Sequence, residues 1–311
     1  MNRFALNYLL EWKYSPNPKP LILRGARQVG KSYLVREFGK EHFDNFLEVN
    51  FERNPETLEV FSSRDPCKVC QLLEAKYGLA VKPGFTLLFL DEIQAAPEVF
   101  ANLRYFYEEM PGLHVIAAGS LLDFVLREHT FSMPVGRVEY LHLGPMSYEE
   151  YLLARGKERL QEWLAGFHPA QEMPRVLHEE FLGLLREYLV VGGMPAAVAA
   201  FAEAGSCQAC DRAKESILAT FRDDFGKYGP RANPLLLAKV FARIPLLVGN
   251  KFKYSHVDRE VRSSELGPAL ERLCLARVAA KVRHSSCNGI PLGAEADDRA
   301  FKVLFLDVGL M

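Results

Sequence analysis

Residues 25–32 read GARQVGKS, and they match the pattern G-x-x-x-x-G-K-[ST]. The apolar run Leu21–Leu23 precedes this stretch, and a helix pattern from about Ser32 to Phe38 follows it. Glycines let a backbone curl so that successive N–H groups point at one phosphate chain, and the following helix adds the positive end of its dipole. The strand, loop and helix in this order predict a phosphate-binding loop that opens a parallel α/β domain.

The loop supplies two side chains with separate roles. Lys31 is expected to reach the β- and γ-phosphates, and the Ser32 hydroxyl is expected to coordinate Mg²⁺. Arg27 is interpreted first as a solvated charge, and the alternative is a direct contact with the nucleotide. The candidate nucleotide-binding residues are Gly25, Ala26, Arg27, Gln28, Val29, Gly30, Lys31, Ser32 and Tyr33, together with Asp91.

A pair of acids follows the buried-type strand Thr86–Leu90, in the stretch LLFLDEIQ. Asp91 is expected to hold the Mg²⁺ shell, and the metal-binding candidates are therefore Ser32 and Asp91. Glu92 is expected to act as the general base that polarises an attacking water. An acid at this position favours hydrolysis over phosphoryl transfer to a metabolite. The sequence has no N-K-x-D motif to read guanine, so we expect the nucleotide to be ATP.

Three further residues are candidates for completing the reaction. Ser120 follows the apolar strand Leu113–Ala118, and it either senses the γ-phosphate region or caps the next helix. An arginine from a neighbouring subunit often completes such a site. Arg137, which lies before the strand-like stretch 138–143, is the preferred candidate, and Arg127 is the alternative.

The composition is typical of a soluble globular protein, and the length predicts more than one domain. The 311 residues are 49% hydrophobic and 25% charged, with a net charge of −1. No apolar run approaches the roughly 20 residues of a membrane helix, and the N-terminal 20 residues lack the pattern of a secretory signal. We therefore expect a cytoplasmic protein with no membrane partner. From Gly226 onward, 14 Lys and Arg face 8 Asp and Glu, which is a mild indication of nucleic-acid contact.

The order of expected elements divides the chain into three regions. Short apolar strands alternate with helices over residues 1–145, which predicts an ATPase core with a parallel sheet covered on both faces. Residues 146–225 are mostly helical and form a connecting or lid region. In residues 226–311, three helices precede two strands separated by an Asn-Gly turn, which is the order of a winged helix-turn-helix. That region either enters a DNA groove through the helix 264–275 or serves for packing and protein contacts.

Seven stretches in fixed order carry a family resemblance: GARQVGKS, LLFLDEIQ, IAAGS, GRVEYLHLGPMSYEEYL, YLVVGGMP, KFKYS and FKVLFLDVGL. The chain resembles the predicted AAA+ superfamily ATPases of bacteria and archaea. The resemblance implies a P-loop core with Walker A and Walker B motifs, then a helical and winged-helix region. It also implies that Lys31, Ser32, Asp91, Glu92 and Ser120 have the roles argued above.

The sequence departs from that family in two ways. It ends at LDVGLM, where family members continue into a restriction-endonuclease-like domain, so we expect no nuclease activity from these residues. Either the chain is naturally short or it is a piece of a longer protein. The stretch 192–197, GGMPAA, has no arginine where many AAA+ lids carry one, and this favours slow turnover.

Two classes of function follow from these expectations. The first is a Mg²⁺-dependent ATPase whose nucleotide state is coupled to DNA, to a protein partner or to further copies of the chain. The second is a switch or DNA-binding module that binds ATP and changes shape with little turnover.

Overall fold

The computed structural model describes residues 2–128, 136–168, 170–229 and 232–311. It divides the chain into two compact units, Asn2–Gly144 and Pro145–Met311. The further division of the second unit after residue 225 remains a proposal from the sequence.

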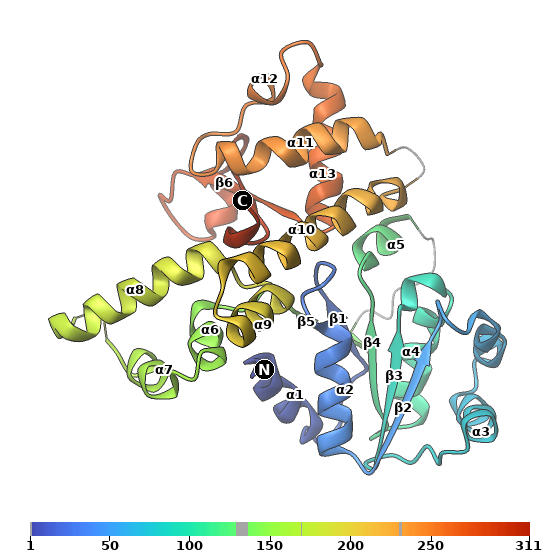
Figure 1. Cartoon of the computed structure of the whole chain (residues 1–311). Helices are drawn as coiled ribbons and strands as arrows, with labels where there is room; N and C mark the ends of the chain where they lie inside the picture. Colours follow the sequence, from blue (N-terminus) through green and yellow to red (C-terminus); the bar gives the residue numbers. More distant parts are fainter. Residues whose placement is uncertain (1, 129–135, 169, 230–231) are drawn as a thin grey trace. The chain divides into compact units, whose positions relative to one another are not determined.

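The first unit is built on a five-stranded sheet in which every neighbouring pair is parallel. The strands are β1 (Leu21–Arg24), β2 (Asn45–Asn50), β3 (Thr86–Asp91), β4 (His114–Ala118) and β5 (Glu139–His142). Their order across the sheet is β2-β3-β4-β1-β5 (Figure 1). The parallel sheet expected from the sequence is therefore confirmed, and β4 lies between the strand before the phosphate loop and the strand that carries Asp91.

Helices connect the strands of the first unit. They are α1 (Ala5–Lys13), α2 (Lys31–His42), α3 (Pro66–Tyr77), α4 (Val99–Glu109) and α5 (Leu122–Glu128), with 3₁₀ turns η1 (Pro55–Ser62) and η2 (Ile93–Ala95).

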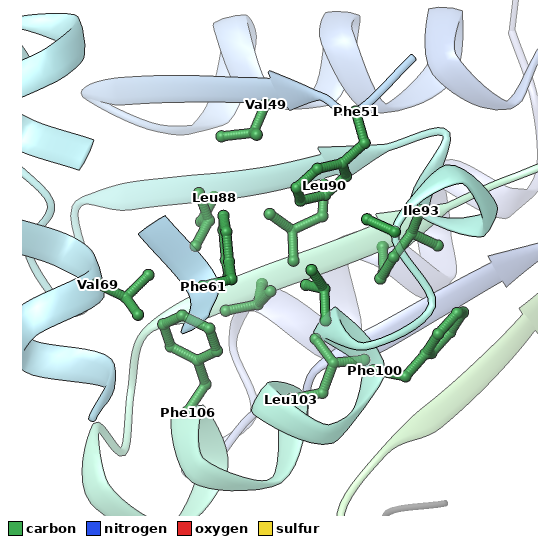
Figure 2. Close-up of a cluster of buried hydrophobic side chains, with 14 of the residues drawn as sticks. Val49, Phe51, Phe61, Val69, Leu88, Leu90, Ile93, Phe100, Leu103 and Phe106 are labelled. Atoms are coloured by element: carbon green, nitrogen blue, oxygen red, sulfur yellow. The ribbon is translucent and has the colours of Figure 1, made fainter. Parts of the chain in front are cut away.

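The core of the first unit forms where α3, α4 and η1 meet the sheet. Leu88 and Leu90 of β3 pack with Leu103 and Phe106 of α4, and Phe61 of η1 joins the same cluster (Figure 2). All five side chains are at most 5% exposed. Burying a side chain of this size contributes about 1.5–3 kcal/mol, so this cluster holds β3 firmly and fixes where its carboxyl end lies.

The second unit begins with four helices in close succession. They are α6 (Tyr148–Ala154), α7 (Glu158–Ala165), α8 (Arg175–Val191) and α9 (Pro195–Ala204). Ser147 and Glu150 form a capping box at the start of α6. α8 ends at Gly192, whose φ of 80° lies in the region that favours glycine. α10 (Cys207–Asp223) packs against α9 and runs into the 3₁₀ turn η3 (Asp224–Lys227).

In residues 232–311 the second unit has three helices and a hairpin. The elements are α11 (Pro234–Leu247), α12 (Tyr254–Val257), α13 (Ser263–Leu275), β6 (Ala279–Ser285), η4 (Leu292–Glu295), β7 (Ala296–Phe305) and η5 (Val308–Leu310). β6 and β7 are antiparallel, and α11 packs on α13 and β7. The order of elements is the expected one, while the assignment as a winged helix remains a proposal.

Within the described residues, no single helix has the length and apolar composition of a membrane span. α8 and α9, which meet at a bend of 119°, reach those values only when they are taken together.

Candidate functional site

The loop between β1 and α2 has the backbone conformation of a phosphate cradle. Gly30 precedes α2 in the left-handed region, with a φ of 89°. Gly25 has a φ of 155°, and a Cβ added there would overlap the carbonyl oxygen of Leu143. Both glycines are therefore required by geometry, because an L side chain would strain the backbone at either position and collide at Gly25.

The start of α2 suits an anion. The first N–H groups of a helix have no partner within the helix, and Gly30 has no side chain with which to cap them. Phosphate oxygens satisfy such groups and interact favourably with the helix dipole. Tyr33, in the first turn, is 57% exposed, so its ring is accessible beside the loop.

Lys31 is buried inside the loop, with 8% of its surface exposed. Its Nζ donates hydrogen bonds to the carbonyl oxygens of Gly25 at 3.0 Å and Ala26 at 2.7 Å. Burial lowers the pKa of Lys31 to about 8, while the nearby carboxylates of Glu92 and Asp91 oppose this shift. The loop therefore holds a cation that has lost most of its water, at the position where the sequence predicted a phosphate contact.

Ser32 and Asp91 meet although they are far apart in sequence. The Ser32 hydroxyl donates to Asp91 Oδ1 at 3.0 Å, and Asp91 is 3% exposed at the end of β3. Burial raises the pKa of Asp91, while the bond from Ser32 opposes this shift. A hydroxyl beside a carboxylate is a donor set that fits Mg²⁺, which takes few protein ligands and keeps other oxygens from water and phosphate.

Two residues that the sequence analysis missed hold the other oxygen of Asp91. Asn50 Nδ2 donates to Asp91 Oδ2 at 3.3 Å, and Arg36 Nη2 lies 3.5 Å from the same oxygen. Arg36 also donates to both carboxylate oxygens of Glu48. Asn50 is the register partner of Asp91 at the carboxyl end of β2, so the strand pattern did contain a signal for it. No pattern in the sequence indicated the contact of Arg36 with Asp91, because a charged residue within a helix usually faces solvent.

Glu92 follows Asp91 in a left-handed backbone conformation, with φ 51° and ψ 43°. This conformation is uncommon for a residue with a side chain and is found disproportionately at functional sites. The Glu92 carboxylate accepts a hydrogen bond from Gln94 Nε2. The two acids of the LLFLDEIQ stretch therefore have different surroundings: Asp91 is buried in a polar network, and Glu92 is partly exposed.

Ser120 lies just beyond the carboxyl end of β4 and is 8% exposed. Its hydroxyl accepts a hydrogen bond of 3.2 Å from Arg27 Nε. The Ser120 side chain is thus joined to the phosphate loop itself. Neither sensing nor capping is tested by this contact, and the role of Ser120 remains a proposal.

The structure describes the side chain of one of the two candidate arginines, Arg137. Arg137 precedes β5, at the amino edge of the sheet, while the phosphate loop lies at the carboxyl edge. Its Nε lies 2.9 Å from Glu108 Oε1, and Arg104 binds the same carboxylate. Arg137 therefore lies away from the phosphate loop of its own sheet, and its role in the reaction remains a proposal. Arg127 has a side chain outside the described part of the structure.

Two family models match the chain. An AAA domain matches residues 17–152, and a domain of unknown function matches residues 182–311. The curated proteins contain no match to the chain.

Three solved structures illustrate the similarity, and each is distant in sequence. The Walker-type ATPase PABY2304 of Pyrococcus abyssi is 18% identical, with a TM-score of 0.60 over 99% of this chain and 94% of that one. The ORC2 protein of Aeropyrum pernix, solved in ADPNP–ADP complexes, is 14% identical, with a TM-score of 0.41 over 89% and 84%. A single-residue variant of RuvB from Thermotoga maritima is also 14% identical, with a TM-score of 0.40 over 89% and 87%.

The family match covers the sheet, the phosphate loop and the acids of β3, and the similarity to the Pyrococcus structure extends over both units. Residues 17–152 are therefore similar to an AAA domain, and the chain has the fold of a P-loop ATPase.

Proposed function

We propose that the chain binds ATP with Mg²⁺ at the loop 25–32 and hydrolyses it. The observation that carries the proposal is the 3.0 Å hydrogen bond between Ser32 and Asp91, beside the buried ammonium of Lys31. Lys31 and Ser32 belong to the first turn of α2 and Asp91 ends β3, and the three groups meet at the carboxyl edge of the sheet. Ligands of parallel α/β sheets bind at this edge.

Each residue has a distinct task in the proposed reaction. Backbone N–H groups of the loop and the Lys31 ammonium bind the phosphates and offset the charge that develops on them. Ser32 and Asp91 would hold Mg²⁺, which supplies further positive charge to the β- and γ-phosphates. Glu92 accepts a proton from the water whose oxygen attacks the γ-phosphorus. The bond from the γ-phosphorus to the bridging oxygen breaks, and ADP leaves with that oxygen.

An arginine from a second copy completes the site in this proposal. Arg137 is the preferred candidate because it lies at the sheet edge opposite the loop, where a neighbouring copy can meet it. Arg127 remains the alternative. The chain would then hydrolyse ATP efficiently only as an oligomer.

The remaining residues would couple the nucleotide state to a partner. Residues 226–311 carry the excess of basic residues, and the order of α11, α12, α13 and the hairpin suits a winged helix that contacts DNA. Fluorescence anisotropy with duplex DNA tests this part. Binding that weakens steeply with salt supports it, and no salt-sensitive binding contradicts it.

A nucleotide-gated switch with little turnover is the second candidate. One observation favours it: the stretch between α8 and α9 contains no arginine that could close on the nucleotide. In this candidate ATP changes the shape of the protein without being consumed at a useful rate.

The variant Glu92→Gln separates the two candidates. Loss of the general base should lower the rate of ATP hydrolysis by about 10²–10⁴-fold and leave ATP affinity intact. Glu98→Gln is the matched control, because Glu98 is an exposed acid six residues further along. Equal rates for the wild type and Glu92→Gln would contradict the ATPase and leave the switch.

A further inference from the structure

Gln94 makes a contact for which neither the fold nor the proposed function accounts. Its side chain lies two residues after Glu92, in the 3₁₀ turn η2, and Nε2 donates to Glu92 Oε2. Glu92 itself is turned by its left-handed backbone. The direction of the Glu92 carboxylate is therefore set by two local features, the backbone at Glu92 and the amide of Gln94.

Chemistry determines which end of the Gln94 amide faces Glu92. An ionised carboxylate only accepts hydrogen bonds, so the NH₂ group must face it and the carbonyl Oε1 must point away. Among the residues that the structure describes, Gln94 Oε1 is one of the buried side-chain atoms without a hydrogen-bond partner. An unpaired buried acceptor destabilises a protein, and an apolar side chain would avoid that cost. Packing alone thus does not explain a glutamine at this position.

The buried end of Gln94 lies against the carboxyl end of β4. A Cβ added at Gly119 would overlap Gln94 Oε1 and would also come within 2.7 Å of Leu122 Cδ2. The φ of Gly119 is outside the range that side chains avoid, so the backbone does not demand glycine there. The tightest contact that a Cβ at Gly119 would make is with the Gln94 amide, so Gly119 leaves the space that this amide occupies, next to Ser120.

We propose that Gln94 is a positioning residue that holds the Glu92 carboxylate in the direction needed for proton acceptance, and that Gly119 makes room for it. This inference rests on the proposed function, because Gln94 has a role in the reaction only if Glu92 takes the proton of the attacking water. Gln94 acts only through Glu92 and does not touch ATP.

The test uses the whole 311-residue chain and compares the kcat and KM of ATP hydrolysis among variants. Gln94→Met keeps the length of the side chain and removes the donor. We expect its kcat to fall about tenfold, with KM for ATP and ATP affinity unchanged. Gln71→Met, at an exposed position of α3, is the matched control and should behave as the wild type.

Two double variants distinguish positioning from a general loss of structure. In the Glu92→Gln background, Gln94→Met should cause no further loss of kcat, because the group through which it acts is already gone. Gly119→Ala should displace the Gln94 amide and lower kcat as Gln94→Met does. Combined with Gln94→Ala, which removes the obstructing amide, Gly119→Ala should lower kcat by a smaller factor than it does in the wild type, because only the contact with Leu122 then remains.

The outcomes separate the inference from the proposed function. Equal kcat for the wild type and Glu92→Gln contradicts the ATPase itself and removes the basis of the inference. A wild type faster than Glu92→Gln but equal to Gln94→Met overturns the inference and leaves the ATPase standing. A Gln94→Met loss that persists in the Glu92→Gln background, or that appears in KM, also overturns it.

Discussion

Lys31 illustrates how the site opposes stability. An ammonium group at 8% exposure has lost most of its hydration, and two carbonyl oxygens replace only part of it. The resulting shift of the pKa from 10.5 to about 8 corresponds to about 3 kcal/mol. A phosphate chain would supply the missing negative charge. The residue is thus better suited to the bound nucleotide than to the stability of the fold.

This cost predicts a pH dependence of stability. Between pH about 8 and 10.5, the unfolded chain keeps a proton on Lys31 that the folded chain has lost, so this residue makes the free energy of unfolding rise with pH. Below pH 8 the buried charge is destabilising. Lys31→Met should therefore be as stable as the wild type or more stable at pH 7, and the difference should shrink by up to about 3 kcal/mol as the pH rises to 10.5.

Chemical denaturation of both proteins at a series of pH values measures this difference. A Lys31→Met variant that is clearly less stable than the wild type at pH 7 would show that the ammonium group stabilises the loop. So would a difference between the two proteins that does not change between pH 8 and 10.5.

At the scale of elements, the sequence allowed the sheet and the main site residues to be predicted. Residues 87–90 of β3 and 115–118 of β4 are all apolar. Parallel strands bring their carboxyl ends to one edge, which places Asp91 near the phosphate loop. The pattern could not reveal that Arg36 reaches Asp91, because this depends on how α2 rotates against β2. Nor could it reveal the contact of Gln94 with Glu92, which follows from the left-handed backbone at residue 92.

A second long-range contact that the sequence could not reveal lies in the second unit. We call it the Asp307 clasp, because the Asp307 carboxylate bonds to the backbone of both Gly193 and Gly309. Two of the family stretches, YLVVGGMP and FKVLFLDVGL, come together there. Asp307 Oδ2 accepts from the N–H of Gly193 at 2.6 Å, and Oδ1 accepts from the N–H of Gly309 at 3.0 Å. A Cβ at Gly192 would overlap Asp307 Oδ1. The clasp fixes η5 to the junction of α8 and α9, a long-range contact that no local pattern indicates.

Asp307→Asn should weaken this clasp. An asparagine has one acceptor oxygen, so its NH₂ group must face one of the two backbone donors and leave it unpaired. Asp307 is 4% exposed, and the loss should be about 1–3 kcal/mol of unfolding free energy. Urea unfolding measures this free energy. Asp298→Asn is the control, because the Asp298 side chain is 80% exposed and its replacement should change the stability little. Equal stability of Asp307→Asn and the wild type would contradict the clasp.

At the scale of the whole molecule, the role that we propose for Arg137 requires assembly. The arginine lies at one edge of the sheet and the phosphate loop at the other, so a contact between them needs two copies. Arg137→Ala should lower kcat by about 10³-fold or more while ATP affinity is retained. Arg104→Ala is the matched control, because Arg104 binds the same Glu108 carboxylate and has no proposed role in the reaction.

Light scattering with and without ATP completes this prediction. The mass of the particle should rise by a whole multiple when ATP and Mg²⁺ are added, and the rise should be absent in Lys31→Met. A monomer that hydrolyses ATP at full rate, or an Arg137→Ala variant as fast as Arg104→Ala, would contradict an arginine supplied by this route.

Binding of ATP at the loop 25–32 is the claim on which the rest depends, and isothermal titration calorimetry tests it most directly. ATP titrated into folded wild-type protein with Mg²⁺ should bind with a measurable heat at one site per chain. Lys31→Met, folded to the same extent, should bind at least about tenfold more weakly, because it lacks the buried cation. Wild-type protein that takes up neither ATP nor ADP under these conditions would contradict the account.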